Sequence, residues 1–414
     1  MKSHLEVKRP NGFLYCVIYM LFYPLLKLMF RLKVDRENYT PPKGAFLVVS
    51  NHVSFMDFLL VMLTFYPRRL NAVAAQKFYF YRPLNKLLPI MGAIPKNLFD
   101  PDIRSIIRIK QVLKRGGRIL LFPEGRCTTA GAYMGIHKST GKLVKNLGVP
   151  VISCYIEGAY TCMPFWRKGL RLGIERVTIA DLFSEEDTRS LSVEDINSAI
   201  DARLSGLEAL SQGKSFHTFR ARQLTEGLQN LLYWCPKCGR EFTLETEGCE
   251  IRCTECGNTA TMDRSAKLIA SPDGVVPESV QEWYREQSTY ESALLSEDMT
   301  SISLHVTVRM PLRASRGIEP CGSGTLFLDP EGWHYLGELS GKTVNLFFPI
   351  DTVPALPFDP DDNFQIYANG TFYAFTPDDG RFCVKYATIG ECAYWRFASR
   401  VQMTPAWNGG FIQA

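Results

Sequence analysis

The sequence predicts an α/β domain with a largely parallel sheet, followed by a four-cysteine metal site and a β-rich C-terminal domain. Three observations lead to this prediction. Short apolar runs alternate with segments of helical period up to about residue 185. Two C-x2-C pairs lie between Cys235 and Cys256. The last hundred or so residues instead alternate apolar and polar side chains, as half-buried strands do.

Length and composition indicate a globular chain of two or three domains. It has 414 residues, and 46% of them are hydrophobic, so sizeable cores can form. The formal net charge of +5 suits an anionic membrane surface or a phosphate-bearing substrate, and is too small to indicate nucleic acid. Of the 12 cysteines, five are clustered and the others are scattered, which is typical of a reducing compartment.

Residues 1–40 contain an apolar run, Phe13 to Phe30, with basic residues before and after it. No small-residue cleavage site follows the run, as a secretory signal would require. Pro24 and Lys27 interrupt it, so we expect a membrane-associating helix or broken helix lying in the cytoplasmic leaflet. A single span and a buried soluble helix remain alternatives. The expected location is the cytoplasmic face of the cell membrane, with peripheral or monotopic attachment.

Residues 41–185 contain the alternating elements of the α/β core. The expected elements are strand 44–52, helix 55–66, helix 103–117, strand 118–125, helix 138–148 and strand 149–158. Such alternation is typical of a largely parallel sheet. Residues 186–230 predict a helical extension. Its first helix spans 190–210 with Ser192 as the N-cap, and a second helix spans 220–234.

Residues 275–414 predict a helix followed by a β-rich domain. The expected elements are helix 277–287, strand 301–310 and a closing helix, 389–402. Residues 329–332, Asp-Pro-Glu-Gly, suit a type I turn, and Asn369-Gly370 is the strongest short hairpin signal. The pattern faintly resembles a pleckstrin-homology or GRAM-like domain, and fold alone does not give a phosphoinositide role.

His52 and Asp57 lie five positions apart, just before an apolar run. Ser54 and Asp57 match a helix-start signature, so the aspartate could be only a first-turn acid and the histidine a loop residue. Side chains five apart on a regular helix are rotated by about 140° and do not meet. They can meet if His52 lies in the loop and Asp57 in the first turn. The carboxylate would then fix the imidazole tautomer and leave the other nitrogen as a base.

A second polar segment follows a predicted strand and contains Glu124, Gly125 and Arg126. The glycine permits a close backbone approach, and the arginine offers a planar fork suited to phosphate. A strand-end turn with a surface arginine would have the same sequence. Cys127 follows directly, but no base neighbours it in the sequence, so we do not expect it to be a nucleophile.

Two lysines could add positive charge to a phosphate site. Lys96 lies in an earlier loop, "GAIPKNLF", and Lys138 lies in "IHKSTGKL" and is the weaker candidate. A lysine acts on phosphate as a point charge. Either one alone is more often a solvated surface residue, so their roles depend on where the fold places them.

Cys235, Cys238, Cys253 and Cys256 form the pattern C-x2-C-x14-C-x2-C. It resembles a zinc ribbon, which we place at residues 231–264, and a glycine follows each pair. Four thiolates leave no position for water, so the expected Zn²⁺ is structural. A reducible disulfide pair is the alternative. Acidic residues flank the cysteines and argue against nucleic acid, so a partner-docking or domain-joining role fits better.

The order of "NHVSFMD", "GAIPKN", "FPEGR" and "VPVISC" resembles the four blocks of the glycerolipid acyltransferase family, which includes lysophosphatidate acyltransferases. The resemblance covers roughly residues 40 to 170. It implies that His52 is the base and Asp57 its partner. The glycerophosphate-binding segment that it implies is Glu124, Gly125 and Arg126.

Three positions depart from the family pattern. Arg126 directly follows Gly125, where the commoner block has a threonine between them. Lys96 is followed by asparagine where the family block commonly ends in arginine, and Ser153 lies in the fourth block, which usually has a proline. These departures bear on the identity of the acceptor more than on the type of reaction.

The resemblance implies transfer of a fatty acyl group from acyl-CoA or acyl carrier protein to the free hydroxyl of a lysophospholipid in phospholipid synthesis. The first candidate acceptor is 1-acylglycerol-3-phosphate, and the expected partners are this lysophospholipid, the thioester donor and membrane lipid, with no nucleic acid. His52 would deprotonate the hydroxyl while Arg126 and Lys96 hold the phosphate. The alternative is a catalytically silent member that acts as a membrane scaffold through its zinc ribbon and β-rich domain.

Overall fold

The structure is a computed structural model that describes residues 6–167, 169–212, 219, 222–295, 302–311, 317–400 and 403–404, with only the backbone for 206–212. The chain divides into two compact units. The first comprises Met1–Pro164, Leu170–Arg220 and Met403–Ala406, and the second comprises Phe165–Gly169, Ala221–Gln402 and Trp407–Ala414. The finer domain boundaries drawn from the sequence stay predictions.

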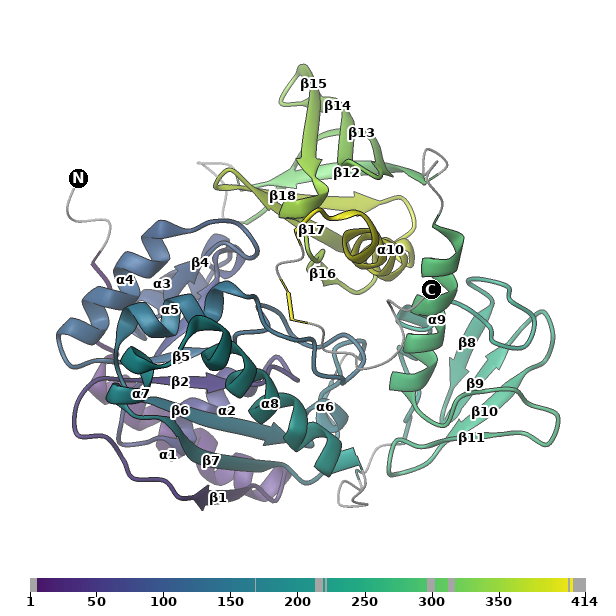
Figure 1. Cartoon of the computed structure of the whole chain (residues 1–414). Helices are drawn as coiled ribbons and strands as arrows, with labels where there is room; N and C mark the ends of the chain where they lie inside the picture. Colours follow the sequence, from purple (N-terminus) through teal and green to yellow (C-terminus); the bar gives the residue numbers. More distant parts are fainter. Residues whose placement is uncertain are drawn as a thin grey trace. The chain divides into compact units, whose positions relative to one another are not determined.

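A seven-stranded sheet forms the centre of the first unit, in the order β1-β7-β6-β2-β5-β3-β4 (Figure 1). Its strands are β1 (Lys33–Glu37), β2 (Phe46–Ser50), β3 (Asn71–Ala75), β4 (Ile94–Lys96), β5 (Arg118–Leu121), β6 (Val151–Glu157) and β7 (Arg176–Phe183). Neighbouring strands are parallel except β6 and β7, which are antiparallel. The mixed but mostly parallel sheet confirms the predicted α/β class.

Helices pack on both faces of this sheet (Figure 1). They are α1 (Gly12–Met29), α2 (Asp57–Thr64), α3 (Leu84–Ile90), α4 (Ile103–Lys114), α5 (Ser139–Leu147), α6 (Ala159–Cys162), α7 (Glu185–Ser190), α8 (Val193–Gln212) and the 3₁₀ helix η1 (Gln76–Phe80). The core that contains Val48 of β2 includes α1 and α2, and the core that contains Leu47 and Val49 includes α4, α5 and α8. β2 is therefore buried along its whole length, as its continuous apolar sequence predicts.

The N-terminal apolar segment forms α1, which is helical through Pro24. One side of the helix packs on its own unit, where the Tyr15 hydroxyl donates a hydrogen bond to the Met62 carbonyl oxygen over 2.9 Å. On the other side Phe13 and Leu28 are 81% and 80% exposed. Within the described part of the chain, α1 is the helix that is long and apolar enough to cross a membrane.

One of the two helices predicted for residues 186–230 is present. α8 begins where predicted, and the Ser192 hydroxyl accepts the Asp195 backbone N–H over 3.0 Å. The predicted helix 220–234 is wrong, because its described residues form turns and one 3₁₀ segment, η2 (Leu228–Asn230). Gly227 has φ +86°, a left-handed conformation that a regular helix cannot contain. The Thr225 hydroxyl donates to the Glu250 carbonyl over 2.9 Å, so tertiary hydrogen bonds replace the helical ladder.

The second unit combines two antiparallel sheets with two long helices (Figure 1). The small sheet has the order β11-β10-β9-β8, and the large sheet has the order β15-β14-β13-β12-β18-β17-β16. The elements are β8 (Leu244–Glu247), β9 (Glu250–Cys253), β10 (Thr259–Met262), β11 (Leu268–Ala270), α9 (Val280–Leu294), β12 (Ser303–Met310), β13 (Glu319–Asp329), β14 (Gly332–Leu339), β15 (Lys342–Pro349), the 3₁₀ helix η3 (Ile350–Thr352), β16 (Phe358–Asp359), β17 (Asn363–Ala368), β18 (Thr371–Pro377) and α10 (Phe382–Phe397).

Both predicted turns of the β-rich region are present. Asp329 pairs with Gly332 between β13 and β14, and Asn369 and Gly370 have positive φ between β17 and β18. The closing helix starts seven residues earlier than predicted, at Phe382 rather than at 389, and residues 401–402 of that prediction lie outside the described residues. A β-rich C-terminal region is confirmed, and its likeness to pleckstrin-homology or GRAM domains stays a prediction.

Candidate active site

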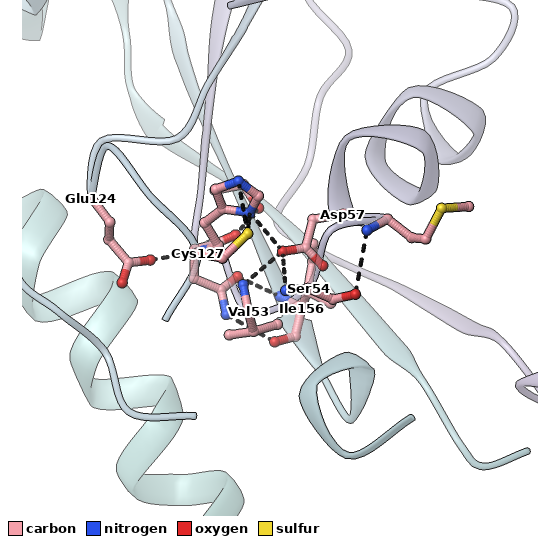
Figure 2. Close-up of polar contacts among 10 residues, drawn as sticks. Val53, Ser54, Asp57, Glu124, Cys127 and Ile156 are labelled. Carbon is pink, nitrogen blue, oxygen red and sulfur yellow. Dashed lines mark hydrogen bonds and ion pairs between the residues drawn. The ribbon is translucent and has the colours of Figure 1, made fainter. Parts of the chain in front are cut away.

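His52 and Asp57 meet in the loop that joins β2 to α2 (Figure 2). The Nδ1 atom of His52 lies 2.9 Å from Oδ2 of Asp57. The same oxygen accepts the backbone N–H groups of Val53 at 2.6 Å and Ser54 at 2.7 Å. Asp57 is fully buried, while 19% of the His52 side chain is exposed. The loop is thus wrapped around one carboxylate, which fixes the ring orientation and directs Nε2 away from the aspartate.

The helix start differs in detail from the sequence-based prediction. α2 begins at Asp57, and Met56 at the N-cap supplies no side-chain hydrogen bond. Ser54 does not cap the helix; its hydroxyl accepts the Met56 backbone N–H over 3.3 Å inside the loop. The predicted capping role of Ser54 is therefore wrong. Asp57 nevertheless lies in the first turn and His52 in the preceding loop, which is the geometry that lets them meet.

Contacts with both strands that flank β2 help to position the loop that carries His52. The Asn51 side chain exchanges two hydrogen bonds with the backbone of Ile156 in β6, at 2.9 and 2.8 Å. The ring of Phe122, just after β5, stacks on the His52 ring with a centroid distance of 4.2 Å. β2 lies between β6 and β5 in the sheet, so both neighbouring strands contribute to fixing the loop.

Glu124 joins this loop to the turn that follows β5. Its Oε1 accepts the His52 backbone N–H over 2.8 Å, and its Oε2 accepts the Met134 backbone N–H over 2.9 Å. In the opposite direction, the Thr128 N–H donates to the His52 carbonyl over 2.8 Å. Glu124 is only 1% exposed. The carboxylate therefore has an architectural role, and its predicted contact with substrate stays a prediction.

We expect Glu124→Ala to destabilise the first unit by about 3 kcal/mol, because two partly buried N–H groups lose their acceptor and a buried side chain is removed. Urea denaturation would measure the free energy of unfolding. Glu37→Ala is the matched control, since this glutamate is 55% exposed and pairs only peripherally with Arg203. A midpoint for Glu124→Ala equal to that of the control would contradict the architectural role.

Gly125 and Arg126 form the turn after β5. Gly125 has φ +80°, a left-handed conformation that favours glycine, and a Cβ there would press on the Phe99 ring at 3.3 Å. Arg126 is only 9% exposed. The turn therefore places a largely buried guanidinium one residue from Cys127, which contacts His52. That Arg126 binds phosphate stays a prediction.

Lys96 ends the edge strand β4, and its Nζ donates to the Asn97 carbonyl over 3.2 Å. Burial lowers the pKa of the lysine, and the charges of Asp102 and Asp100 partly oppose that shift. Burial also lowers the pKa of His137, and the charge of Lys96 adds to this effect, so these two groups are electrostatic neighbours. A hydrogen bond between Lys96 and the other predicted site residues is not seen in the described structure.

Cys127 is the residue that sequence reasoning set aside and that the fold brings next to His52 (Figure 2). Its Sγ lies 3.3 Å from Nε2 and 3.5 Å from Nδ1 of His52. The two residues are 75 positions apart, but they follow β2 and β5, which are adjacent parallel strands in which Val49 pairs with Leu121. The signal that could have found the contact is this strand adjacency, because loops at the carboxyl ends of neighbouring parallel strands meet.

The surroundings of His52 favour its protonated form. Burial of the ring lowers the pKa, but the charges and hydrogen bonds of Cys127 and Asp57 outweigh it and hold the pKa of His52 well above its ordinary value. A carboxylate next to an imidazole stabilises the imidazolium. The histidine is thus a stronger base than an isolated imidazole, and it can accept a proton from a hydroxyl or thiol placed at Nε2.

The four predicted metal ligands come together in the second unit. The sulfurs of Cys235, Cys238, Cys253 and Cys256 all lie within 4.8 Å of one another. The Cys235–Cys256 and Cys238–Cys253 sulfur pairs are each 3.8 Å apart, far beyond the roughly 2.05 Å of a disulfide bond. Four thiolates on a tetrahedral ion at about 2.3 Å would be separated by about 3.8 Å. The cluster therefore fits a tetrahedral metal such as Zn²⁺.

Part of this chain is similar in sequence to known acyltransferases. Residues 31–157 match the family model described as Acyltransferase. A chloroplastic 1-acyl-sn-glycerol-3-phosphate acyltransferase of Brassica napus is 26% identical over 161 residues, which cover 36% of this chain and 46% of the relative. The chain therefore contains an acyltransferase domain. Its acyltransferase domain contains the His52–Asp57 pair and the turn from Glu124 to Arg126.

Two further proteins are similar to this acyltransferase domain. A chloroplastic 1-acyl-sn-glycerol-3-phosphate acyltransferase of Arabidopsis thaliana is 24% identical over 136 residues, covering 32% of this chain and 38% of the relative. The crystal structure of the 1-acyl-sn-glycerophosphate acyltransferase PlsC from Thermotoga maritima is 22% identical, with a TM-score of 0.41, and covers 48% of this chain and 80% of that chain. The chain spans less than half the length of the curated relatives it matches.

Proposed function

We propose that the chain transfers a fatty acyl group from acyl-CoA or acyl carrier protein to the free hydroxyl of a lysophospholipid, with 1-acylglycerol-3-phosphate as the first candidate. The observation that carries the proposal is the 2.9 Å contact between His52 and Asp57 within an acyltransferase domain. A catalytically silent scaffold would have no need to keep a buried carboxylate on the Nδ1 side of this ring. The names of the relatives support the choice of acceptor.

The chemistry follows from the geometry around His52. With Nδ1 held by Asp57, the Nε2 atom takes the proton of the acceptor hydroxyl. The resulting oxygen nucleophile attacks the thioester carbonyl carbon, and the donor thiol leaves. The proton held on Nε2 passes to the departing sulfur. Asp57 stabilises the imidazolium that exists between the two proton transfers.

Phosphate recognition is assigned to the positive groups near the turn after β5. Arg126 has the planar fork that suits a phosphate monoester, and it precedes Cys127, which touches His52. Lys96 would add positive charge, and the same charge helps to lower the pKa of its neighbour His137, which favours the neutral imidazole. Arg126 directly follows Gly125, and asparagine rather than arginine follows Lys96, so we expect the headgroup to be held differently from the common family pattern.

The acyl chain and the membrane are assigned to the apolar surface of the same unit. Phe55, between His52 and Asp57, is 54% exposed, and its ring contacts Phe58 and Phe78. The exposed face of α1 adds further apolar area. An apolar helix face of this kind inserts into the boundary between lipid headgroups and acyl chains. This arrangement supports peripheral or monotopic attachment, with the cytoplasmic face as the proposed side.

The second unit is proposed to hold one structural Zn²⁺ on its four cysteines. A closed four-thiolate site leaves no position for substrate, so the ion would stabilise the fold without taking part in acyl transfer. The ammonium of Lys385 in α10 contacts the carboxylates of Glu241, which lies between the two cysteine pairs, and of Glu291 in α9. These ion pairs support a domain-joining role for the ribbon.

Acceptor-dependent thiol release tests the proposed reaction. The purified chain is bound to phospholipid vesicles and given a long-chain acyl-CoA with lysophosphatidate, glycerol 3-phosphate or lysophosphatidylcholine. We expect the fastest release of CoA with lysophosphatidate, because it offers both a phosphate monoester and one free hydroxyl. If neither acyl-CoA nor acyl carrier protein gives acceptor-dependent release with any lysolipid, acyl transfer is the wrong function.

A further inference from the structure

The end of the described chain returns to the unit that holds the candidate active site. Ala221–Gln402 belongs to the second unit, but Met403–Ala406 belongs to the first. Met403 is 7% exposed, and it pairs with His137 in an antiparallel bridge. Met403 and the next residue, Thr404, are called the C-terminal segment below. This segment therefore adds an extra piece of backbone to the acyltransferase unit.

Thr404 forms hydrogen bonds through both its backbone and its side chain. Its N–H donates to the Ile136 carbonyl over 2.8 Å, and its hydroxyl oxygen accepts the Ile136 N–H over 2.8 Å. The same hydroxyl donates to Oδ1 of Asp201 in α8 over 2.7 Å, and the Tyr133 hydroxyl donates to that oxygen over 2.9 Å. Ile136 is fully buried, and a buried backbone group needs a partner. Thr404 therefore serves both backbone groups of Ile136.

The loop that Thr404 contacts, between β5 and α5, also contacts the loop that carries His52. Two residues before Ile136, the Met134 N–H donates to Oε2 of Glu124 over 2.9 Å. Oε1 of the same carboxylate accepts the His52 N–H over 2.8 Å. The backbone of His52 is thus fixed, through Glu124, to a segment whose other end is bonded to Thr404.

We propose that Thr404 is a positioning residue for acyl transfer, because it holds the loop through which Glu124 keeps His52 in place. The proposal rests on the acyltransferase function proposed above. It adds to that function a residue far outside the matched domain, which ends at residue 157. Thr404 acts through Ile136 and the loop, and not by contact with the substrate. A displacement of about 1 Å far from the chemistry can lower a rate about 100-fold, so such a contact can control the rate.

The contact requires a hydroxyl group at position 404. The side chain has to accept the Ile136 N–H and donate to the Asp201 carboxylate at the same time, and a hydroxyl does both. Valine has nearly the shape of threonine without the hydroxyl, whereas serine keeps the hydroxyl. Thr404→Val therefore removes both side-chain hydrogen bonds with little change in volume, and Thr404→Ser preserves them.

Steady-state kinetics of the full chain on phospholipid vesicles test the proposal. Palmitoyl-CoA is kept at a fixed concentration, and lysophosphatidate is varied. We expect Thr404→Val to lower kcat at least about 10-fold, with a smaller change in KM, because the series of contacts ends on the backbone of His52. Thr404→Ser should retain the wild-type kcat. A wild-type kcat in Thr404→Val would overturn the proposal, and so would an increase.

Two further variants separate positioning from a general loss of stability. Asp201→Ala removes the acceptor of the Thr404 hydroxyl and should also lower kcat, and the double variant should lose no more than Asp201→Ala alone. Thr289→Val makes the same chemical change on the exposed surface of α9 and should leave kcat unchanged. Each rate is measured well below the thermal unfolding midpoint of its variant. If Thr404 only stabilises the fold, kcat per folded chain will equal that of the wild type.

Amide hydrogen exchange tests the same contact without an assay of activity. In Thr404→Val, the amides of residues 51–54 and 133–136 should exchange faster than in the wild type, and in Thr289→Val they should not. Unchanged exchange of residues 51–54 in Thr404→Val overturns the positioning role, whether or not the chain acylates lysophosphatidate. If the wild type acylates no lysolipid but Thr404→Val shows the faster exchange, the proposed function is wrong, while Thr404 still positions the loop of His52.

Discussion

We expect His52→Ala to lower the proposed acyl transfer by about 10²- to 10⁴-fold, because the reaction would lose its general base and the positioned acceptor hydroxyl would keep its proton. The loss should be in kcat more than in KM, since the ring is not assigned to substrate binding. Thiol release from a long-chain acyl-CoA in the presence of lysophosphatidate measures it.

His305→Ala is the matched control for this variant. His305 is an exposed histidine of the second unit that is paired with Asp378, so its loss should leave the rate unchanged. Equal rates for His52→Ala and the wild type would remove the base from the mechanism. Loss of activity in His305→Ala as well would point to a general effect on the protein rather than to the site.

The pH profile gives a second readout of the same residue. Burial lowers the pKa of His52, but Cys127 and Asp57 outweigh this and raise it above 6.5. A base must be neutral to accept a proton, so activity should rise with pH and reach half its maximum above pH 6.5. Asp57→Asn removes the charge that stabilises the imidazolium, so the rise should move to lower pH while the maximal rate falls. If activity rises at the same pH in Asp57→Asn as in the wild type, Asp57 does not influence the pKa that controls activity.

Removing one ligand of the cysteine cluster should unfold the zinc ribbon. Structural Zn²⁺ in small domains supplies about 10–16 kcal/mol of apparent binding free energy, and much of it is folding free energy. We expect wild-type protein to contain one zinc ion per chain by elemental analysis, and Cys238→Ser to contain almost none. The β8–β11 sheet of the variant should then become sensitive to protease.

Cys249→Ser is the matched control, because Cys249 lies between the two pairs in sequence but its sulfur donates to the Arg222 carbonyl instead of joining the cluster. It should keep the full zinc content and the protease resistance of the wild type. A wild-type chain without stoichiometric zinc would refute the metal site. A Cys238→Ser chain that keeps both zinc and protease resistance would show that this residue is not a ligand.

The sequence correctly predicted those elements that depend only on residues close together in the chain. The apolar strand Phe46–Ser50, the Ser192 cap and the Asn369-Gly370 hairpin depend on neighbours within a few residues, and all three are present. The failed helix at 220–234 also has a helical apolar period. Contacts with residues distant in sequence override this helical preference. The Tyr233 hydroxyl donates to the Glu291 carboxylate over 2.8 Å, and the Tyr233 backbone N–H donates to the Gln287 side chain over 2.9 Å.

The contacts of the candidate site also differ in how far apart in sequence their residues are. The His52–Asp57 contact spans five residues and could be predicted once a loop-to-helix transition was recognised. The approach of Cys127 could not, because it depends on β5 lying next to β2 although β3 and β4 intervene in the chain. Strand order in an α/β sheet is a property of the whole domain. The same reason hid the role of Glu124, which bonds a backbone group 72 residues away.

The hydrogen bonds through Glu124 and Thr128 have a consequence for engineering this acyltransferase domain. They fasten the loop after β2 to the turn after β5 at both the N–H and the carbonyl of His52. The two segments therefore form a single structural unit. An exchange of substrate preference with another family member should succeed when both segments are transplanted together, and transplanting either one alone should misplace the base.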